Sequence, residues 1–491
     1  MSSNNANNLT QKTISGVIWK FAERIGAQMV TLIISIVLAR ILMPDDYGII
    51  AIVTIFITLC NVFVTHGFGA ALIQKKDADE VDFSSMFYVS SLVSLLLYAV
   101  IFFSAPFIAN FYGNELIGPV LRVMGLRLPI ASVNSIQQAY VSRKMDFKKF
   151  FFATLGATLI SGAVGIYMAY SGFGVWALVS QYLITAFLST IILVFVVRWF
   201  PKLVFSFKRV KILFSYGWKL LVSGLVDTGY KELRSLVIAK KYTSTDLAYY
   251  DKGRQFPSLI ATNVNASLDT VLFSAMSKVQ DDKNKVKSIT RKSIKTGAFL
   301  LMPCLFGLAA VATTFVKIIL TDKWLPAVPY IQIMCFVYAF WPIHTANLQA
   351  IKAVGRTDLF LVLEIIKKAV GITSLLISMW FGVIWIAITE MLTTIIASFI
   401  NAYPNKKLLN YSYLEQVKDI LPYFLSSAFM AVLVYLVGLI KLNVYLLFII
   451  QIALGVIIYV SISYAFRFEA FNFILSFIKS KLKRNKNNEK V

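Results

Sequence analysis

The sequence predicts an all-α polytopic membrane protein with about fourteen transmembrane helices. Of its 491 residues, 58% are apolar and only 15% are charged, and the mean hydropathy is +0.73. A soluble domain has about a quarter charged residues. The apolar runs extend over about 20 residues, as membrane helices require, and lack the short alternating pattern of barrel strands.

Fourteen spans can be assigned in chain order. Some are joined by tight glycine turns, such as the SGFG stretch at residues 171–174, and the seventh and eighth are interrupted by charged residues. The spans lie near residues 15–40, 47–73, 83–109, 116–141, 150–170, 174–197, 212–239, 246–276, 296–319, 325–351, 359–381, 383–404, 419–440 and 444–466.

The charges of the connecting segments orient these spans. With the N-terminus in the cytoplasm, the inner segments hold 31 lysines and arginines and the outer segments hold six. Such an excess is typical of cytoplasmic loops, so both termini are predicted to be cytoplasmic. All outer loops are short, and the longest inner loop is expected at residues 277–295, SKVQDDKNKVKSITRKSIK.

A weak internal repeat of about 200 residues divides the spans into two halves. Asp46 matches Asp246 at a spacing of 200, and Pro129-Ile130 matches Pro342-Ile343 at a spacing of 213. Each half holds six spans, so both enter the membrane in the same orientation, and two lobes around a central cleft are expected. The predicted parts are a cytoplasmic tail (1–14), an N-lobe (15–200), a C-lobe (201–405), two C-terminal spans (406–466) and a basic cytoplasmic tail (467–491).

Several spans carry cations that lipid would not tolerate. Each charge at the centre of a span disfavours insertion by about 2.5–3.5 kcal/mol, so such residues are expected to face water or a partner. They occur at several depths and on the equivalent first spans of both halves, which favours a path for an anion. The predicted binding residues are Lys20, Arg24, Arg127, Lys219, Lys231, Arg234 and Arg254.

Three acidic residues accompany these cations. Glu23, Asp227 and Asp269 are expected to take part in coupling or in charge pairs. A structural alternative stays open, in which Glu23–Arg24 and Asp227–Lys231 are neutralised pairs and the outermost lysines reach the headgroups. No nucleotide-binding loop, catalytic constellation, metal-ligand spacing or nucleic-acid motif is readable, so no catalytic residue, metal, cofactor or nucleic-acid partner is expected.

Three stretches near the N-terminus carry a family resemblance. They are SGVIWKFAERIGAQ, LARILMPDDYGIIAIV and GFGAALIQKK, which begin at residues 15, 38 and 67. The chain resembles bacterial polysaccharide flippases of the multidrug/oligosaccharidyl-lipid/polysaccharide exporter superfamily, in the branch for O-antigen, colanic-acid-like and teichuronic-acid-like units. The LARxLxPxDYG pattern is the most specific part of the match.

The resemblance implies a function as well as a fold of fourteen helices in two lobes. It implies movement of undecaprenyl-diphosphate-linked oligosaccharide from the inner to the outer leaflet of the bacterial cytoplasmic membrane by alternating access, for surface polysaccharide such as lipopolysaccharide. Related flippases have a cationic cavity, for which Arg24, Arg234 and Arg254 are the best matches. The implied partners are the lipid-linked oligosaccharide, membrane lipid, a polysaccharide polymerase and glycosyltransferases.

Three other function classes were weighed. A lipid II flippase shares the fold. A cation-coupled multidrug exporter of the same superfamily would depend on acidic residues such as Asp227 and Asp269, and the cationic excess disfavours it. A membrane-embedded polymerase or glycosyltransferase would need a large outer loop or a nucleotide-sugar motif, and the sequence shows neither, so no enzyme is expected.

Overall fold

The computed structural model describes residues 26–65, 69, 72–73, 75, 77–144 and 148–472. For residues 144, 148–149, 216, 266–271 and 273–274 it describes the backbone alone. Within these ranges every regular element is helical, and the contacts between elements divide the chain into two compact units, residues 1–248 and 249–491. An all-helical polytopic fold was predicted from the composition, and this prediction is confirmed.

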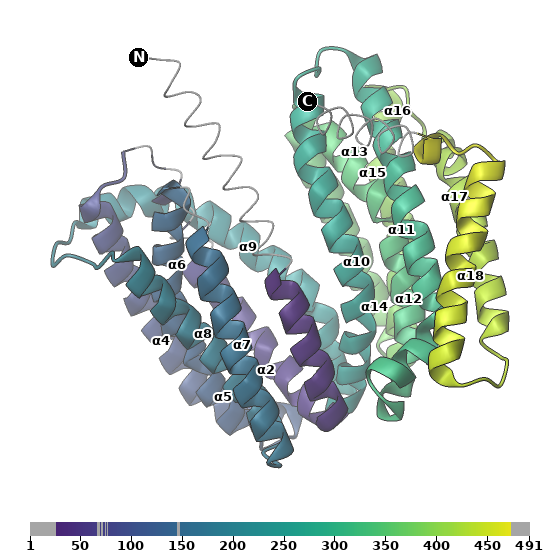
Figure 1. Ribbon diagram of the computed structural model, residues 1–491. Coiled ribbons are helices and arrows are strands. Elements are labelled where there is room, and N and C mark those ends of the chain that lie inside the picture. The colour runs from purple at the N-terminus through teal and green to yellow at the C-terminus, as the bar shows by residue number, and fades with distance from the viewer. Residues whose placement is uncertain are drawn as a thin grey trace, which may run out of the picture. The chain divides into compact units, whose positions relative to one another are not determined.

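The first unit is a bundle of helices in which α7 and α8 run side by side and α9 packs against α2 and α4 (Figure 1). It begins with a helix at Gly26–Ile41. Its further helices are α2 (Pro44–Val64), α4 (Glu80–Tyr112), α5 (Ile117–Gly125), α6 (Arg127–Lys144), α7 (Lys148–Tyr170), α8 (Val175–Val197), α9 (Phe207–Lys241) and the start of α10 (Ser244–Ser277).

The second unit is built around α11, which packs against α12, α13, α17 and α18. After the main part of α10, its elements are α11 (Lys283–Ile319), the 3₁₀ helix η2 (Asp322–Ala327), α12 (Val328–Ala339), α13 (Trp341–Ala353), α14 (Thr357–Ser378), α15 (Val383–Ala402), α16 (Asn405–Leu408), α17 (Tyr413–Val437) and α18 (Val444–Ala465).

Helices occupy all fourteen ranges in which the sequence predicts a span. Within the described residues, nine helical segments are long and apolar enough to cross a membrane, and helix Gly26–Ile41 is shorter but apolar. Helices α6, α9 and α10 are the least apolar, and they carry charges noted above. A helix of about 34 residues is about 50 Å long, more than the hydrocarbon thickness requires.

Two spans are broken at equivalent places. The fourth span ends α5 at Gly125 and resumes as α6, while the tenth ends α12 at Ala339 and resumes as α13. Pro129 lies in the first turn of α6 and Pro342 in the first turn of α13. Proline lacks an N–H and fits a first helical turn, where no intrahelical partner is needed, so each proline marks the start of a new helix.

The second and eighth spans also begin alike. The Met43 N–H donates to Asp46 Oδ2 at 3.0 Å, and the Thr243 N–H donates to Asp246 Oδ2 at 3.2 Å. In both cases a carboxylate in the first helical turn accepts a hydrogen bond from the backbone ahead of the helix. Asp46 and Asp246, which match in the sequence repeat, thus accept the same hydrogen bond at the start of their helices.

The segment expected as the longest inner loop is mostly helical, which corrects the prediction. Helix α11 begins at Lys283, inside that segment, and Asp282 caps it by accepting from the N–H groups of Asn284 and Lys285 at 3.1 Å each. The dense charges suggested a solvated loop. They are interleaved with a buried face of Val286, Thr290, Ser293 and Ile294, whose spacing is that of an amphipathic helix.

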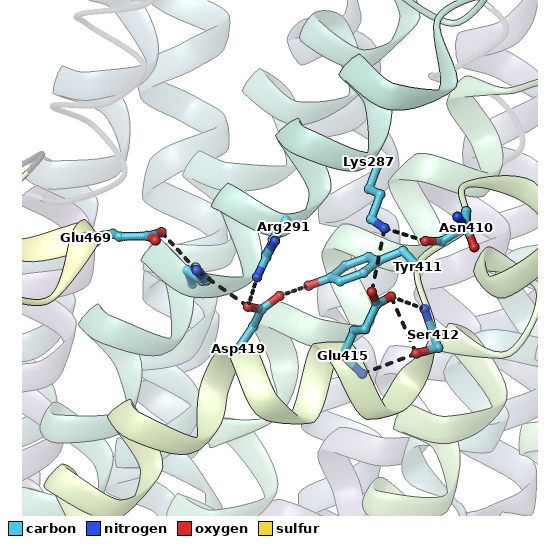
Figure 2. Close-up of polar contacts among 9 residues, drawn as sticks. Lys287, Arg291, Asn410, Tyr411, Ser412, Glu415, Asp419 and Glu469 are labelled. Atoms are coloured by element: carbon cyan, nitrogen blue, oxygen red, sulfur yellow. Dashed lines mark hydrogen bonds and ion pairs between the residues drawn. The ribbon is translucent and has the colours of Figure 1, made fainter.

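Ion pairs join this extension of α11 to α17 (Figure 2). Asp419 of α17 is almost fully buried, and its Oδ1 lies 2.7 Å from Arg291 Nη2 and 3.5 Å from Lys295 Nζ, while the Tyr411 hydroxyl donates to Oδ2 at 2.7 Å. Lys295 also pairs with Glu469, just beyond α18, at 2.9 Å. Lys295, which contacts both carboxylates, therefore joins α11 to α17 and to the segment after α18.

The lobe boundaries predicted at residues 200 and 405 stay predictions, as does the central cleft, which concerns both units together. Within the first unit, α9 belongs with α2 and α4, although the sequence assigns it to the C-lobe.

Candidate functional site

The structure describes the side chains of six of the ten predicted site residues. These are Arg127, Lys219, Asp227, Lys231, Arg234 and Arg254. Lys20, Glu23 and Arg24 lie outside the described residues, and for Asp269 only the backbone is described. The site can therefore be built from α6, α9 and α10.

Helix α9 places Asp227, Lys231 and Arg234 on one side, because they are separated by four and three residues. Lys231 Nζ lies 2.7 Å from Asp227 Oδ2, and the two side chains are 67% and 48% exposed. The lysine charge is thus compensated at the surface of this unit. An incoming anion would have to compete with Asp227 for Lys231.

Arg234 lies one turn further along α9 and is buried, with 9% of its surface exposed. Its guanidinium carbon lies 6.0 Å from the centre of the Tyr230 ring, at the outer limit of a cation–π contact. Lys219 is exposed and lies about 22 Å from Arg234 along the helix axis, because fifteen residues rise 1.5 Å each. The structure thus brings Arg234 close to the Asp227–Lys231 pair, whereas Lys219 stands apart.

Arg127 owes its position to the break in the fourth span. It is the first residue of α6, and its guanidinium carbon lies 5.2 Å above the ring of Tyr182 on α8. The aromatic ring covers one face of the guanidinium, so a bidentate interaction of Arg127 would use its planar edge. Arg127 and the α9 residues belong to the same unit but to different helices.

In the second unit, α10 carries Arg254 beside Asp251. Arg254 Nη2 lies 3.5 Å from Asp251 Oδ1, and both side chains are about 30% exposed. The neighbouring Tyr250 donates its hydroxyl to Glu390 Oε2 on α15 at 2.6 Å. Arg254 thus has one acidic group on its own helix and a second one near it on α15.

The sequence analysis missed Lys252, which is 5% exposed in the middle of this group. Its ammonium donates to Gln255 Oε1 at 3.0 Å and lies 5.6 Å from the ring of buried Trp324 in η2. The lysine was visible in the sequence next to Asp251. Helical periodicity places Lys252 on a different face from Arg254, and the sequence does not show that a neighbouring element buries that face.

These residues can bind an anion without forming a covalent bond. Arginine presents a rigid, always charged fork that matches phosphate geometry, and acidic neighbours partly neutralise Lys231 and Arg254. In the described part of the chain, no group of three or more His, Cys, Asp and Glu side chains could hold a metal ion.

Comparison with protein families identifies the chain. The model of a family described as "Polysaccharide biosynthesis protein" matches residues 37–329, more than half of the sequence. The teichuronic acid biosynthesis protein TuaB of Bacillus subtilis is 24% identical over 358 residues, which cover 72% of this chain and 73% of TuaB. The succinoglycan biosynthesis transport protein ExoT of Rhizobium meliloti is 23% identical over 346 residues, 70% of each chain.

A solved structure has the same fold. The lipid II flippase MurJ, in an inward closed conformation, superposes with a TM-score of 0.73 at 18% identity, and the match covers 92% of this chain and 98% of MurJ. At this level of identity the likeness concerns the fold alone. It shows that a membrane transporter of lipid-linked material can have this arrangement of helices.

Proposed function

Because the chain belongs to this polysaccharide biosynthesis family, we propose that it is a flippase for undecaprenyl-diphosphate-linked oligosaccharide. It moves the repeat unit from the cytoplasmic to the outer leaflet of the bacterial inner membrane, with both termini in the cytoplasm. The observation that carries the proposal is the set of cations on membrane helices of a chain with a flippase fold. Two relatives are named for teichuronic acid biosynthesis and for succinoglycan biosynthesis transport, and these names support a lipid-linked glycan as the substrate class.

The substrate has three chemically different parts, and each binds in a different environment. Arg234 in the first unit and Arg254 in the second are each suited to bind a phosphate group, because guanidinium binds phosphate oxygens in pairs. The glycan stays hydrated, and the prenyl chain stays in lipid. Lys231 can exchange Asp227 for the diphosphate, so this lysine has an anionic partner both with and without substrate.

The transport step follows from alternating access. Substrate binding lowers the free energy of whichever conformation closes around the diphosphate, and release to the outer leaflet follows when the protein opens to that side. Asp227, Asp251 and Glu390 are suited to re-pair with the cations after release. Uptake of the product by a polysaccharide polymerase, and supply of substrate by glycosyltransferases, would drive the cycle in one direction.

A gene deletion with complementation tests this proposal. In the native host, deletion should abolish surface polysaccharide and accumulate lipid-linked oligosaccharide on the cytoplasmic leaflet. A wild-type copy should restore export, and Arg254→Ala should fail to do so. Arg254→Lys should restore part of the function, since it keeps the charge but loses the fork.

Arg356→Ala is the matched control. Arg356 is also paired with an aspartate close in sequence, Asp358, at 2.7 Å, but it lies in the connection before α14 and its side chain is 47% exposed. It should restore export fully. Normal surface glycan in the deletion strain would refute the proposal, and rescue of a strain depleted of its lipid II flippase would change the substrate.

A further inference from the structure

The connection between α8 and α9 has a composition that transport does not explain. We call this connection together with the start of α9, residues 198–211, RWFPKLVFSFKRVK, the strap. Four of its large apolar side chains are more than half exposed, with Leu203 at 97%, Phe207 at 73%, Phe200 at 59% and Phe205 at 55%. Four exposed cations alternate with them, namely Arg198, Lys202, Lys208 and Lys211.

The strap is fixed to the start of α4. The buried Trp199 anchors it, since its indole N–H donates to Glu80 Oε2 at 3.0 Å and its carbonyl accepts from Gln137 Nε2 at 2.9 Å. Three more hydrogen bonds run from the Lys202 N–H to Ser84 Oγ (2.9 Å), from the Ser206 N–H to Ser85 Oγ (3.0 Å) and from the Tyr88 hydroxyl to the Lys202 carbonyl (3.0 Å).

This anchoring decides which side chains are presented outward. Trp199 packs into a core with Phe83 and Val210, so the strap already has a buried face. The exposed phenylalanines and Leu203 are therefore a second apolar face, separate from the buried one. A loop that only had to cross water between two helices would need neither face.

The depth of the strap follows from α8. This helix is long and apolar enough to span the membrane, and its last turn exposes Phe195 at 70% and Val196 at 41%. Such side chains face lipid in a spanning helix. Arg198 comes directly after Val197, the last residue of α8, so the strap begins where the chain leaves the hydrocarbon. Aromatic side chains interleaved with Lys and Arg are typical of that level of a bilayer.

We propose that the strap is a docking surface for anionic phospholipid headgroups at the membrane surface. Leu203 and the exposed phenylalanines insert at the boundary between headgroups and acyl chains, and the four cations contact the headgroup phosphates. In the orientation that the loop charges predict, the leaflet is the cytoplasmic one, whose negative surface potential attracts such segments.

The insertion depth can be measured by spin labelling of the full chain. In a background with Cys60, Cys304 and Cys335 replaced, a label is placed at Leu203→Cys, and the protein is reconstituted in nanodiscs containing phosphatidylglycerol. We expect collisions with oxygen, which concentrates in lipid, to exceed those with a water-soluble nickel complex. A label at Lys283→Cys, an exposed residue at the start of α11, should show the opposite preference.

Headgroup specificity is measured by native mass spectrometry of the protein released from lipid. K202Q/K208Q/K211Q should retain several-fold less phosphatidylglycerol than wild type, and retention of phosphatidylcholine should change little. The control K278Q/K283Q/K292Q removes the same charge from exposed residues of a stretch, residues 274–298, whose sequence contains no aromatic residue. It should retain phosphatidylglycerol as wild type does.

Three results would overturn the proposal. The Leu203 label could be as accessible to nickel as the Lys283 label, which would place the strap in water. It could be shielded from both reagents, which would mean that protein covers it. Equal loss of phosphatidylglycerol in the two triple variants would mean that net charge, and not the strap, holds the lipid.

Discussion

Gly48→Ala should destabilise the protein although alanine is the better helix former. Gly48 lies in the first turns of α2, where it meets the backbone of Ser244 at the start of α10. A Cβ at Gly48 would lie 2.8 Å from the Ser244 Cβ and would overlap the carbonyl of that residue. The hydroxyl of Ser244 also donates to Asp45, so this contact is already tightly fixed.

The magnitude follows from the geometry. Carbon atoms pack best at about 3.5–4.0 Å, so the two helix starts would have to separate by at least about 0.7 Å. Overpacking usually disfavours folding by about 1–3 kcal/mol, and the upper half of this range applies because the obstacle is backbone, which has no rotamer to change. Alanine returns up to about 1 kcal/mol of helix propensity. The expected net loss is about 1–2 kcal/mol.

Thermal unfolding in detergent, followed by tryptophan fluorescence at a fixed scan rate, measures the effect. For a unit of this size, about 1–2 kcal/mol corresponds to an apparent Tm about 2–8 °C lower. Gly229→Ala is the control, because Gly229 lies in the interior of α9 and no atom lies within 4 Å of its virtual Cβ. It should melt at or slightly above the wild-type temperature. A Gly48→Ala variant as stable as Gly229→Ala would refute this account of the α2–α10 contact.

Two further perturbations test the ion pairs at the helix ends. Asp419→Ala should lower the apparent Tm by several degrees, corresponding to about 2 kcal/mol, because the Tyr411 hydroxyl loses its acceptor and Lys295 keeps only Glu469, while Arg291 is half-exposed and regains water. Asp358→Ala, at an exposed pair, should change little, and equal effects would contradict the buried role of Asp419. Asp79, which accepts from Arg209, has its pKa lowered to about 2 by that hydrogen bond. Its stabilising effect is therefore complete above the ordinary pKa of about 4 and is lost as pH falls toward 2. The Tm difference between wild type and Asp79→Asn should be constant from pH 5 to 8 and shrink below about pH 4, and a difference that grows in acid would contradict the assignment.

Much of the fold follows from hydropathy, because a bilayer forces each spanning segment to satisfy its own backbone as a helix. All fourteen ranges contain helices for this reason. Hydropathy does not predict the start of α11 at Lys283, because the first turns of this helix are rich in charged residues. Its helical state depends on packing of Val286 and Ile294 and on pairing of Arg291 with Asp419, and both partners come from distant parts of the chain.

The candidate site is predictable only in part. Charge inside apolar spans points to Arg127, Arg234 and Arg254, because the penalty for such a charge is large wherever the helix packs. Their partners depend on tertiary structure. The stacking of Arg127 on Tyr182 and the hydrogen bond from Tyr250 to Glu390 join different helices, and the sequence gives no register between those helices.

We propose that this chain moves a diphosphate-linked glycan lipid across the membrane. The most direct test reconstitutes the purified protein in liposomes with undecaprenyl-diphosphate oligosaccharide confined to the inner leaflet, and follows its cleavage by a glycosidase that cannot cross the membrane. Wild type and Arg356→Ala should make the glycan accessible, and Arg254→Ala should be slower by at least about tenfold, as expected for the loss of about 1.4 kcal/mol or more of anion binding. A glycan that stays protected in the presence of folded wild-type protein would contradict the claim.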